Sequence, residues 1–309
     1  CTCNPTLPRL SEGGTGGRHD MGKLLPIEVV SREEYAADEA AAAAHGVALR
    51  DLRRPAILEY DVASHRLREV VLACLGMPSA GTAHTDGEAL EALRAPKENP
   101  DPYHQRLQRS GYRGPSTFYI KKWYCGTRSP APTGKLFDKA YCDFVRHVIL
   151  PHVGDPQGIV FQRRPTFRCH VAKGGEATGK VHNDSQYGHS RCELNFWLPL
   201  TRTVGSNSLF AESAPGAKDF APFELEYGQC QRFWGAQCVH YTEPNETDLT
   251  RVSIDFRVLP RSCHEDGTGY RRQFSLGCFF AAMDAEGSVT HWGDKGEAET
   301  DGDGGEGED

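Results

Sequence analysis

Three residues in the second half of the chain have the chemistry of a metal-ligand set: His182, Asp184 and His240. His182 and Asp184 stand two positions apart, and in an extended segment side chains at that spacing project to one face. One imidazole and one carboxylate can therefore bind a single ion. A second imidazole from a distant strand completes a set of three ligands on one face of the ion. Such a set leaves adjacent coordination positions open, which suits iron(II) that must bind both a co-substrate and dioxygen.

Arg251 and Ser253 also lie two positions apart, in a segment that reads as a later strand. A guanidinium forms a bidentate, charge-assisted clamp on a carboxylate, and a neighbouring hydroxyl adds a donor. This pair suits the far end of a bound dicarboxylate such as 2-oxoglutarate, whose 2-oxo acid end can chelate iron. The alternatives are that His240 is an ordinary strand histidine, and that Arg251 pairs with a surface acid such as Glu246 or Asp248.

At these residues the chain resembles the iron(II)/2-oxoglutarate dioxygenase superfamily, whose pattern is H-x-D, a later His and R-x-S on a double-stranded β-helix. The stretches HNDSQYGHSRCELNFWLPLT, GSNSLFAES and HYTEPNETDLTRVSIDFRV look more narrowly like the StrG-type proteins named from streptomycin biosynthesis. The resemblance covers roughly residues 166–260. It implies Fe(II) as cofactor, with 2-oxoglutarate and O2 as co-substrates, release of succinate and CO2, and oxidation of a substrate C–H bond.

A second group of residues is predicted around this set. Asn195 and Trp197 share one face of the aromatic segment 192–200, so we predict that Asn195 binds the co-substrate and that Trp197 lines the substrate pocket. Arg168, Tyr187 and Arg191 complete the predicted substrate-contacting residues. The competing interpretation is that these five side chains lie in the core, on a solvated face or in structural ion pairs.

The elements that must position these residues divide the chain into four parts. Residues 1–25 read as a disordered N-terminal segment, and 26–155 as a mainly helical region that opens on the capping-box pattern Ser31 to Glu34. Within that region helices are expected up to residue 54 and over 65–75, 85–94 and 135–150, the last stopped by Pro151. Residues 156–284 form the predicted catalytic core, and 285–309 an acidic disordered tail.

Short aromatic and β-branched runs separated by turn residues predict the strands of the core. The fold class is therefore mainly β with α: a double-stranded β-helix, or jelly roll, behind an N-terminal helical region. The expected strands are 159–161, 166–172, 192–200, 208–212, 223–227, 231–234, 238–242, 251–259 and a closing strand within 274–283.

Composition limits the classes of partner. The net charge of −7 resides in the acidic segment after residue 292, which leaves a balanced body without the basic footprint of a nucleic-acid-binding protein. No apolar run reaches the length of roughly 18 residues that a membrane span needs.

The 11 cysteines are irregularly spaced, without C-x-x-C, so reduced thiols in a cytoplasmic compartment are expected. No signal-peptide pattern is present, and a first residue of Cys rather than Met indicates that the natural start lies elsewhere.

The substrate class follows less directly from the sequence. We predict a small polar metabolite, because a helical region ahead of the catalytic sheet can wall one side of a pocket and enclosure favours small ligands. A protein side-chain hydroxylase is the second candidate, for which an open groove across the metal is expected. A cupin-like metal-binding protein without oxygenase activity is the third, although such a protein has no need for Arg251 and Ser253.

Overall fold

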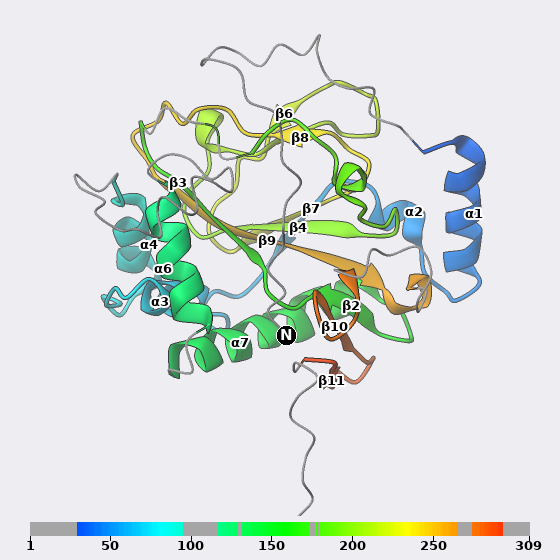
Figure 1. The fold of residues 1–309 in the computed structure, drawn as a ribbon, viewed down its shortest axis with the longest axis horizontal. Coiled ribbons are helices and arrows are strands. Elements are labelled where there is room, and N and C mark those ends of the chain that lie inside the picture. The colour runs from blue at the N-terminus through cyan, green and yellow to red at the C-terminus, as the bar shows by residue number, and fades with distance from the viewer. Residues whose placement is uncertain are drawn as a thin grey trace, which may run out of the picture.

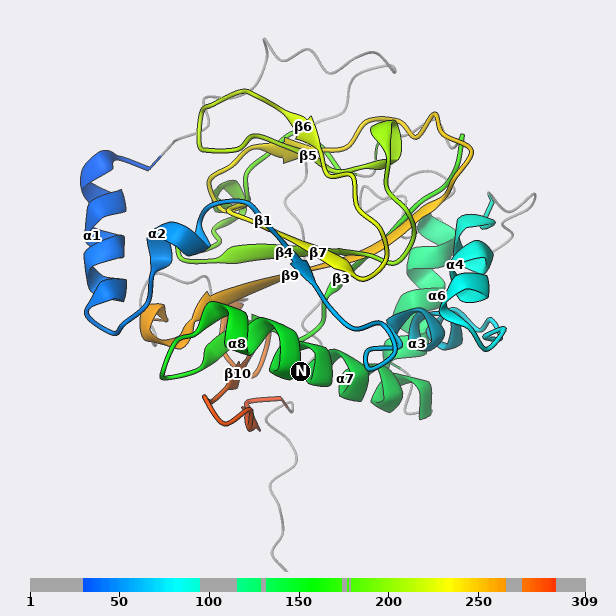
Figure 2. The ribbon, with the colours of Figure 1, turned by 180° about the vertical axis from the view of Figure 1, so that it is seen from behind.

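The computed structural model describes residues 30–94, 116–128, 132–173, 177, 179–264 and 274–292. Two antiparallel β-sheets and several helices make up this part of the chain. The larger sheet lies in the middle of the molecule, with the smaller sheet on one side and α7 (Pro132–Phe144) on the other (Figures 1 and 2). The predicted combination of a mainly β core with a helical region is therefore present.

The larger sheet has the strand order β1-β7-β4-β9-β2-β10-β11, and β3 pairs with β9; the smaller sheet has the order β6-β5-β8. The strands are β1 (Ala56–Glu59), β2 (Ile159–Gln162), β3 (Thr166–His170), β4 (Leu194–Pro199), β5 (Phe210–Ala211), β6 (Ala221–Pro222), β7 (Gln229–Phe233), β8 (His240–Tyr241), β9 (Arg251–Pro260), β10 (Phe280–Met283) and β11 (Val289–Thr290).

Helix α1 begins where the sequence signals predicted, whereas α6 (Ser116–Arg128) lies in a segment for which no helix was predicted. Ser31 and Glu34 form a reciprocal capping box at the start of α1. Besides α7, the α-helices are α1 (Arg32–Ala43), α2 (Leu49–Leu52), α3 (Leu67–Cys74), α4 (Ala83–Glu91), α6 (Ser116–Arg128) and α8 (Leu150–Val153). A π-helical turn, η2 (Val145–Ile149), and three 3-10 turns, η3 (Asp184–Tyr187), η4 (Gly205–Asn207) and η5 (Arg261–Cys263), complete the described helical elements.

The expected stop of the long helix at Pro151 is wrong. The helical path continues from α7 through η2 into α8 and ends at Gly154, whose φ of 68° closes the helix in the left-handed region. Pro151 is tolerated because it stands in the first turn of α8, where a backbone N–H has little need of a helical acceptor. The π turn just before it resets the hydrogen-bond register.

Three strand predictions need correction. The helical region also contributes a strand, since β1 pairs with β7 at the edge of the larger sheet. The strand expected over 223–227 is absent from the described structure of that segment, and the short β6 lies just before it. The tail expected from residue 285 includes β11, which pairs with β10. The remaining residues of the predicted tail, from 293 on, and residues 1–25 lie outside the described ranges.

Trp292 ties the end of the described chain to the core. Its ring lies 6.1 Å from that of Phe161, and its carbonyl accepts a hydrogen bond from Arg163 Nη1 at 2.8 Å. Because partial burial of a large aromatic side chain stabilises a fold, Trp292→Ala should lower the free energy of unfolding by about 1–2 kcal/mol. Denaturant titration measures this change. The exposed Glu286 provides a control, and an equal effect of Glu286→Ala would contradict the anchoring role.

Arg232 fastens β7 to the helical layer. Its guanidinium donates to His152 Nε2 and to the carbonyl oxygens of Asp51 and Arg54, the last two at 2.8 Å. Burial and then the Arg232 charge lower the pKa of His152 to about 4 from its ordinary value of 6.5. At a pH between these two pKa values, His152 is protonated in the unfolded chain but neutral in the folded chain. A decrease in pH should therefore destabilise the fold.

We therefore expect the stability of the wild-type protein to fall as the pH decreases from about 6.5 to 4. His152→Gln keeps an acceptor for Arg232 but cannot titrate, so part of this pH dependence should disappear. Urea unfolding at several pH values measures it. An unchanged slope in the variant would show that His152 titrates normally in the folded protein.

Strand β9 has two chemically different faces. Val252, Ile254, Phe256 and Val258 belong to the main hydrophobic core, where Phe256 meets the rings of Tyr141 and Phe196 at 5.3 and 5.6 Å. The intervening residues carry polar side chains, and by the alternation of a strand they point to the opposite face, toward the smaller sheet. These residues are Arg251, Ser253, Asp255 and Arg257. The polar face is where the candidate site lies.

No helix in the described ranges combines the length and the apolar character needed to cross a membrane. The nine cysteines within those ranges are free thiols.

Candidate metal centre

His182 and His240 are brought together by their backbones. The N–H of each donates to the carbonyl of the other, at 3.1 and 2.8 Å, so that residue 182 forms a bridge beside β8. The prediction that His182 and Asp184 lie in one extended segment is wrong in detail, since Asp184 starts the 3-10 turn η3, capped by Asn183. The backbone N–H of Asp184 donates to Gly235 O at 2.9 Å, and this bond fixes where the carboxylate emerges.

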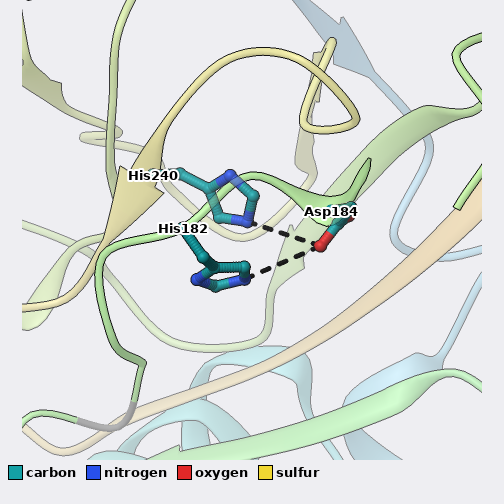
Figure 3. A group of neighbouring side chains, drawn as sticks. All are labelled: His182, Asp184 and His240. Atoms are coloured by element: carbon teal, nitrogen blue, oxygen red, sulfur yellow. Dashed lines mark ion pairs between the residues drawn. The ribbon is translucent and has the colours of Figure 1, made fainter. Parts of the chain in front are cut away.

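The three predicted ligands converge. His182 Nε2 lies 3.6 Å and His240 Nε2 3.9 Å from Asp184 Oδ1, and the two imidazole centroids are 4.3 Å apart (Figure 3). One nitrogen or oxygen from each residue lies within 4.8 Å of the other two. Asp184 and His240 are buried, and His182 is half-buried. Three potential donor atoms around one small space is the arrangement that a single ion requires.

The hydrogen bonds of the imidazoles direct their lone pairs into this space. His240 Nδ1 lies 3.0 Å from Cys238 O, and His182 Nδ1 lies 2.5 Å from Lys180 O. A proton on each Nδ1 satisfies these carbonyls and leaves both Nε2 atoms as acceptors. Burial and then the neighbouring His182 lower the pKa of His240 to about 4, so this ring is neutral at ordinary pH.

Asp184 remains ionised, and one of its two carboxylate oxygens has no hydrogen bond within the described structure. Burial alone raises its pKa, but the Arg257 guanidinium and the nearby His182 and His240 hold the pKa well below the ordinary 3.8. Among the described residues no donor hydrogen-bonds to Oδ1, although the atom is buried. A buried carboxylate oxygen without a hydrogen bond, close to the Nε2 atoms of two imidazoles, fits a divalent cation.

The other oxygen of Asp184 is fully occupied. Asn195 Nδ2 donates to Oδ2 at 2.6 Å, and Arg257 Nε donates to the same atom at 2.9 Å. Asn195, predicted to bind a co-substrate, therefore contacts a predicted metal ligand. Arg257 was missed, although its place in the period-two alternation after Arg251, in a strand rich in apolar residues, was a usable signal.

Arg251 and Ser253 share the polar face of β9, as predicted. Arg251 is 1% exposed, and its Nη1 donates to Ser253 Oγ at 3.1 Å. Burial and then the neighbouring Arg168 charge lower the pKa of Arg251 to about 9, which leaves the guanidinium protonated at neutral pH. Of the two surface acids named as alternative partners, Asp248 forms an ion pair with Lys173 instead.

The predicted substrate residues divide into two groups. Tyr187 lies against the predicted ligand His182, with ring centroids 5.3 Å apart, and Trp197 lies 5.6 Å from the Arg251 guanidinium. Arg168, opposite Ser253 in the pairing of β3 with β9, forms an ion pair with Asp255 at 2.9 Å. Tyr187 and Trp197 thus lie beside His182 and Arg251, whereas the ion pair of Arg168 fits the competing structural interpretation.

Arg191, also predicted to contact the substrate, makes its described contacts with α1 and Trp234. Its guanidinium forms ion pairs with Glu34 at 2.9 Å and Asp38 at 3.2 Å, and its carbonyl accepts from Trp234 Nε1. These contacts fasten α1 to the sheet.

A cleft of about 840 Å³ opens between β1 and η2, and its lining includes Tyr60, His65, His147 and His152. None of its lining residues belongs to the predicted metal or co-substrate set. This cleft is therefore not where a substrate would meet His182, and the enclosed pocket expected beside the predicted ligands stays a prediction.

Comparison with known proteins gives one partial relative. The streptomycin biosynthesis protein StrG of Streptomyces griseus is 40% identical over 129 residues, which make up 41% of this chain and 60% of that protein. The chain thus matches less than two thirds of the relative's length. No protein-family model matches the chain.

Among solved structures, the chain is similar to the non-haem monooxygenase ThoJ. Its nickel complex aligns with 16% identity over 69% of this chain and 76% of ThoJ, with a TM-score of 0.38. The metal-free form aligns over the same shares with 14% identity and the same TM-score. At this level the likeness supports no conclusion about fold or function.

Proposed function

We propose that this chain is an iron(II)- and 2-oxoglutarate-dependent oxygenase that hydroxylates a small polar metabolite. The observation that carries the proposal is the buried Oδ1 of Asp184, which has no hydrogen bond within the described structure and lies beside the Nε2 atoms of His182 and His240. Two imidazoles and one carboxylate oxygen form the donor set that suits non-haem iron(II) with open coordination positions.

The strand order supports a double-stranded β-helix as the fold. From β3 onward the chain crosses repeatedly between the two sheets: β3, β4, β7 and β9 lie in the larger sheet, and the bridge at His182, the consecutive strands β5 and β6, and β8 lie in or beside the smaller one. Each sheet thus receives four consecutive neighbours, β7-β4-β9-β3 on one side and β6-β5-β8 with the bridge on the other. The proposed ligands lie between these two layers.

The chain's own residues would divide the work of binding. His182, Asp184 and His240 would hold the metal, and Arg251 with Ser253 would bind the distal carboxylate of 2-oxoglutarate. Because Arg251 is buried, its charge is poorly screened by water, and a carboxylate there gains more than it would at the surface. When bound, iron(II) and 2-oxoglutarate supply the oxidising chemistry.

The substrate class rests on the rim residues and on the partial relative. Tyr187 beside His182 offers a hydroxyl and an aromatic face, and Arg168, in its ion pair with Asp255, lies opposite Ser253. Such a rim suits a polar metabolite that carries a carboxylate or phosphate. The partial likeness to a protein named for streptomycin biosynthesis favours an intermediate of natural-product metabolism.

Succinate formation tests the proposal. Purified protein supplied anaerobically with iron(II) and then given 2-oxoglutarate and air should form succinate, and a metabolite library should contain a compound that stimulates this turnover. Omission of iron or addition of a chelator is the control. Iron uptake without any succinate would favour the cupin-like alternative, and stimulation by peptides alone would favour the protein-hydroxylase alternative.

A further inference from the structure

We infer that Arg257, Asn195 and Gly235 form a clamp that makes Asp184 a ligand through Oδ1 alone. The inference rests on the proposed metal centre and goes beyond it, because it assigns how the carboxylate binds and which residues decide this. The two donors at 2.6 and 2.9 Å both meet Oδ2, and both are buried. Charge-assisted hydrogen bonds of this length compete with a cation for that oxygen.

The clamp is rigid because its two donors come from the central strands of the larger sheet. Asn195 in β4 and Arg257 in β9 are direct partners in the antiparallel register. Gln162 Oε1 accepts from the backbone N–H of Arg257 at 3.3 Å and from its Nη1 at 3.2 Å, which fixes the guanidinium from the β2 side. Contacts from three neighbouring strands, β2, β4 and β9, therefore hold Oδ2 in place.

Gly235 provides the space that the Asn195 amide occupies. A Cβ atom at position 235 would lie 2.6 Å from Asn195 Cγ and 2.7 Å from each of its amide heavy atoms, closer than real contacts allow. The carbonyl of the same residue accepts the backbone N–H of Asp184. Because Gly235 has no side chain, the Asn195 amide can reach the Asp184 carboxylate. The carbonyl of Gly235 also holds the backbone of Asp184 in place.

The chemical consequence concerns the open coordination positions. A carboxylate that chelates with both oxygens takes two positions of an octahedral ion, whereas one that binds through a single oxygen takes one. With two imidazoles, single-oxygen binding leaves three positions, and a chelating 2-oxo acid plus dioxygen need three. Arg257, Asn195 and Gly235 are therefore positioning residues, which act on the metal through Asp184.

Cobalt(II) is a suitable probe because its visible absorption reports the coordination number without turnover. The variants are Gly235→Ala, Asn195→Ala and Arg257→Lys, each checked for a folded circular-dichroism spectrum. Loss of residues that orient a ligand typically weakens metal binding about 10–100-fold, so we expect that loss in cobalt affinity by calorimetry. We also expect a shifted absorption band as Oδ2 becomes free to coordinate.

Arg232→Lys is the matched control, since Arg232 is a buried arginine of the same sheet that contacts the helical layer instead of Asp184. Its cobalt affinity and spectrum should equal those of the wild type. If all three folded variants bind cobalt with the affinity and spectrum of the wild type, the clamp is overturned but the proposed metal centre is not. A wild-type protein that binds no cobalt would overturn the proposed metal centre and the clamp together.

Discussion

Replacement of Asp184 by Ala is expected to abolish stoichiometric iron(II) or manganese(II) uptake and, with it, any 2-oxoglutarate turnover. The substitution removes the buried oxygen that lies between the two imidazoles. It also leaves the Arg257 charge buried without its carboxylate, which in general destabilises a fold by about 3–5 kcal/mol. Asp184→Asn is therefore the sharper variant, because its amide oxygen can still accept from Arg257 and Asn195.

Metal content by elemental analysis after gel filtration measures the outcome. Asp155→Asn is the matched control, since Asp155 is also buried but accepts hydrogen bonds from the backbone N–H groups of Gln157 and Ser262. It should retain one metal ion per chain. Full metal content in folded Asp184→Asn and Asp184→Ala would show that the ligand assignment is wrong.

Arg251→Ala is expected to raise the apparent KM for 2-oxoglutarate by roughly 30- to 4,000-fold. Removal of one partner from a buried, hydrogen-bonded charge pair costs about 2–5 kcal/mol, and each 1.4 kcal/mol is a factor of about ten. The low exposure of Arg251 and its bond to Ser253 place it in this class and not among surface charges. Metal affinity should change far less, because Arg251 is not among the proposed ligands.

Succinate formation at varied 2-oxoglutarate concentration measures this KM, and manganese calorimetry measures metal binding in the same variant. Arg251→Lys should give an intermediate loss, since an ammonium group keeps the charge but cannot form the planar fork. A similar rise in KM for the primary substrate, or no rise for 2-oxoglutarate, would count against the proposed role.

The sequence predicted the elements of the core well because each carries a local signal. The ten-residue strand β9 alternates apolar and polar residues, and α1 opens with a capping box. The errors have tertiary causes. Strand β1 has only four residues and forms because β7 offers an edge, and the helix passes Pro151 because a π turn precedes it. Neither effect is visible in a short window of sequence.

The candidate site was predictable in its ligand types but not in its supporting contacts. The spacing of His182, Asp184 and His240 identified atoms that the fold brings within 4.8 Å. The partners of Asp184 depend on strand register, which places Asn195 opposite Arg257, and no local pattern encodes register. Arg191 lies in the turn before β4, and its ion pair with Asp38 of α1 is likewise a tertiary contact that the local sequence does not encode.

The two-faced composition of β9 has a consequence for how the chain reaches its native alignment. A slip of one residue against β4 would turn four polar side chains, two of them arginines, into the aromatic core and expose four apolar ones between the sheets. Burial of unpaired charge costs several kcal/mol per group, so misaligned sheets should be disfavoured early in folding. The polar residues proposed to bind ligands thus also favour the native register of β9 against β4. Substitutions that make this face of β9 apolar should yield a chain that aggregates or folds slowly.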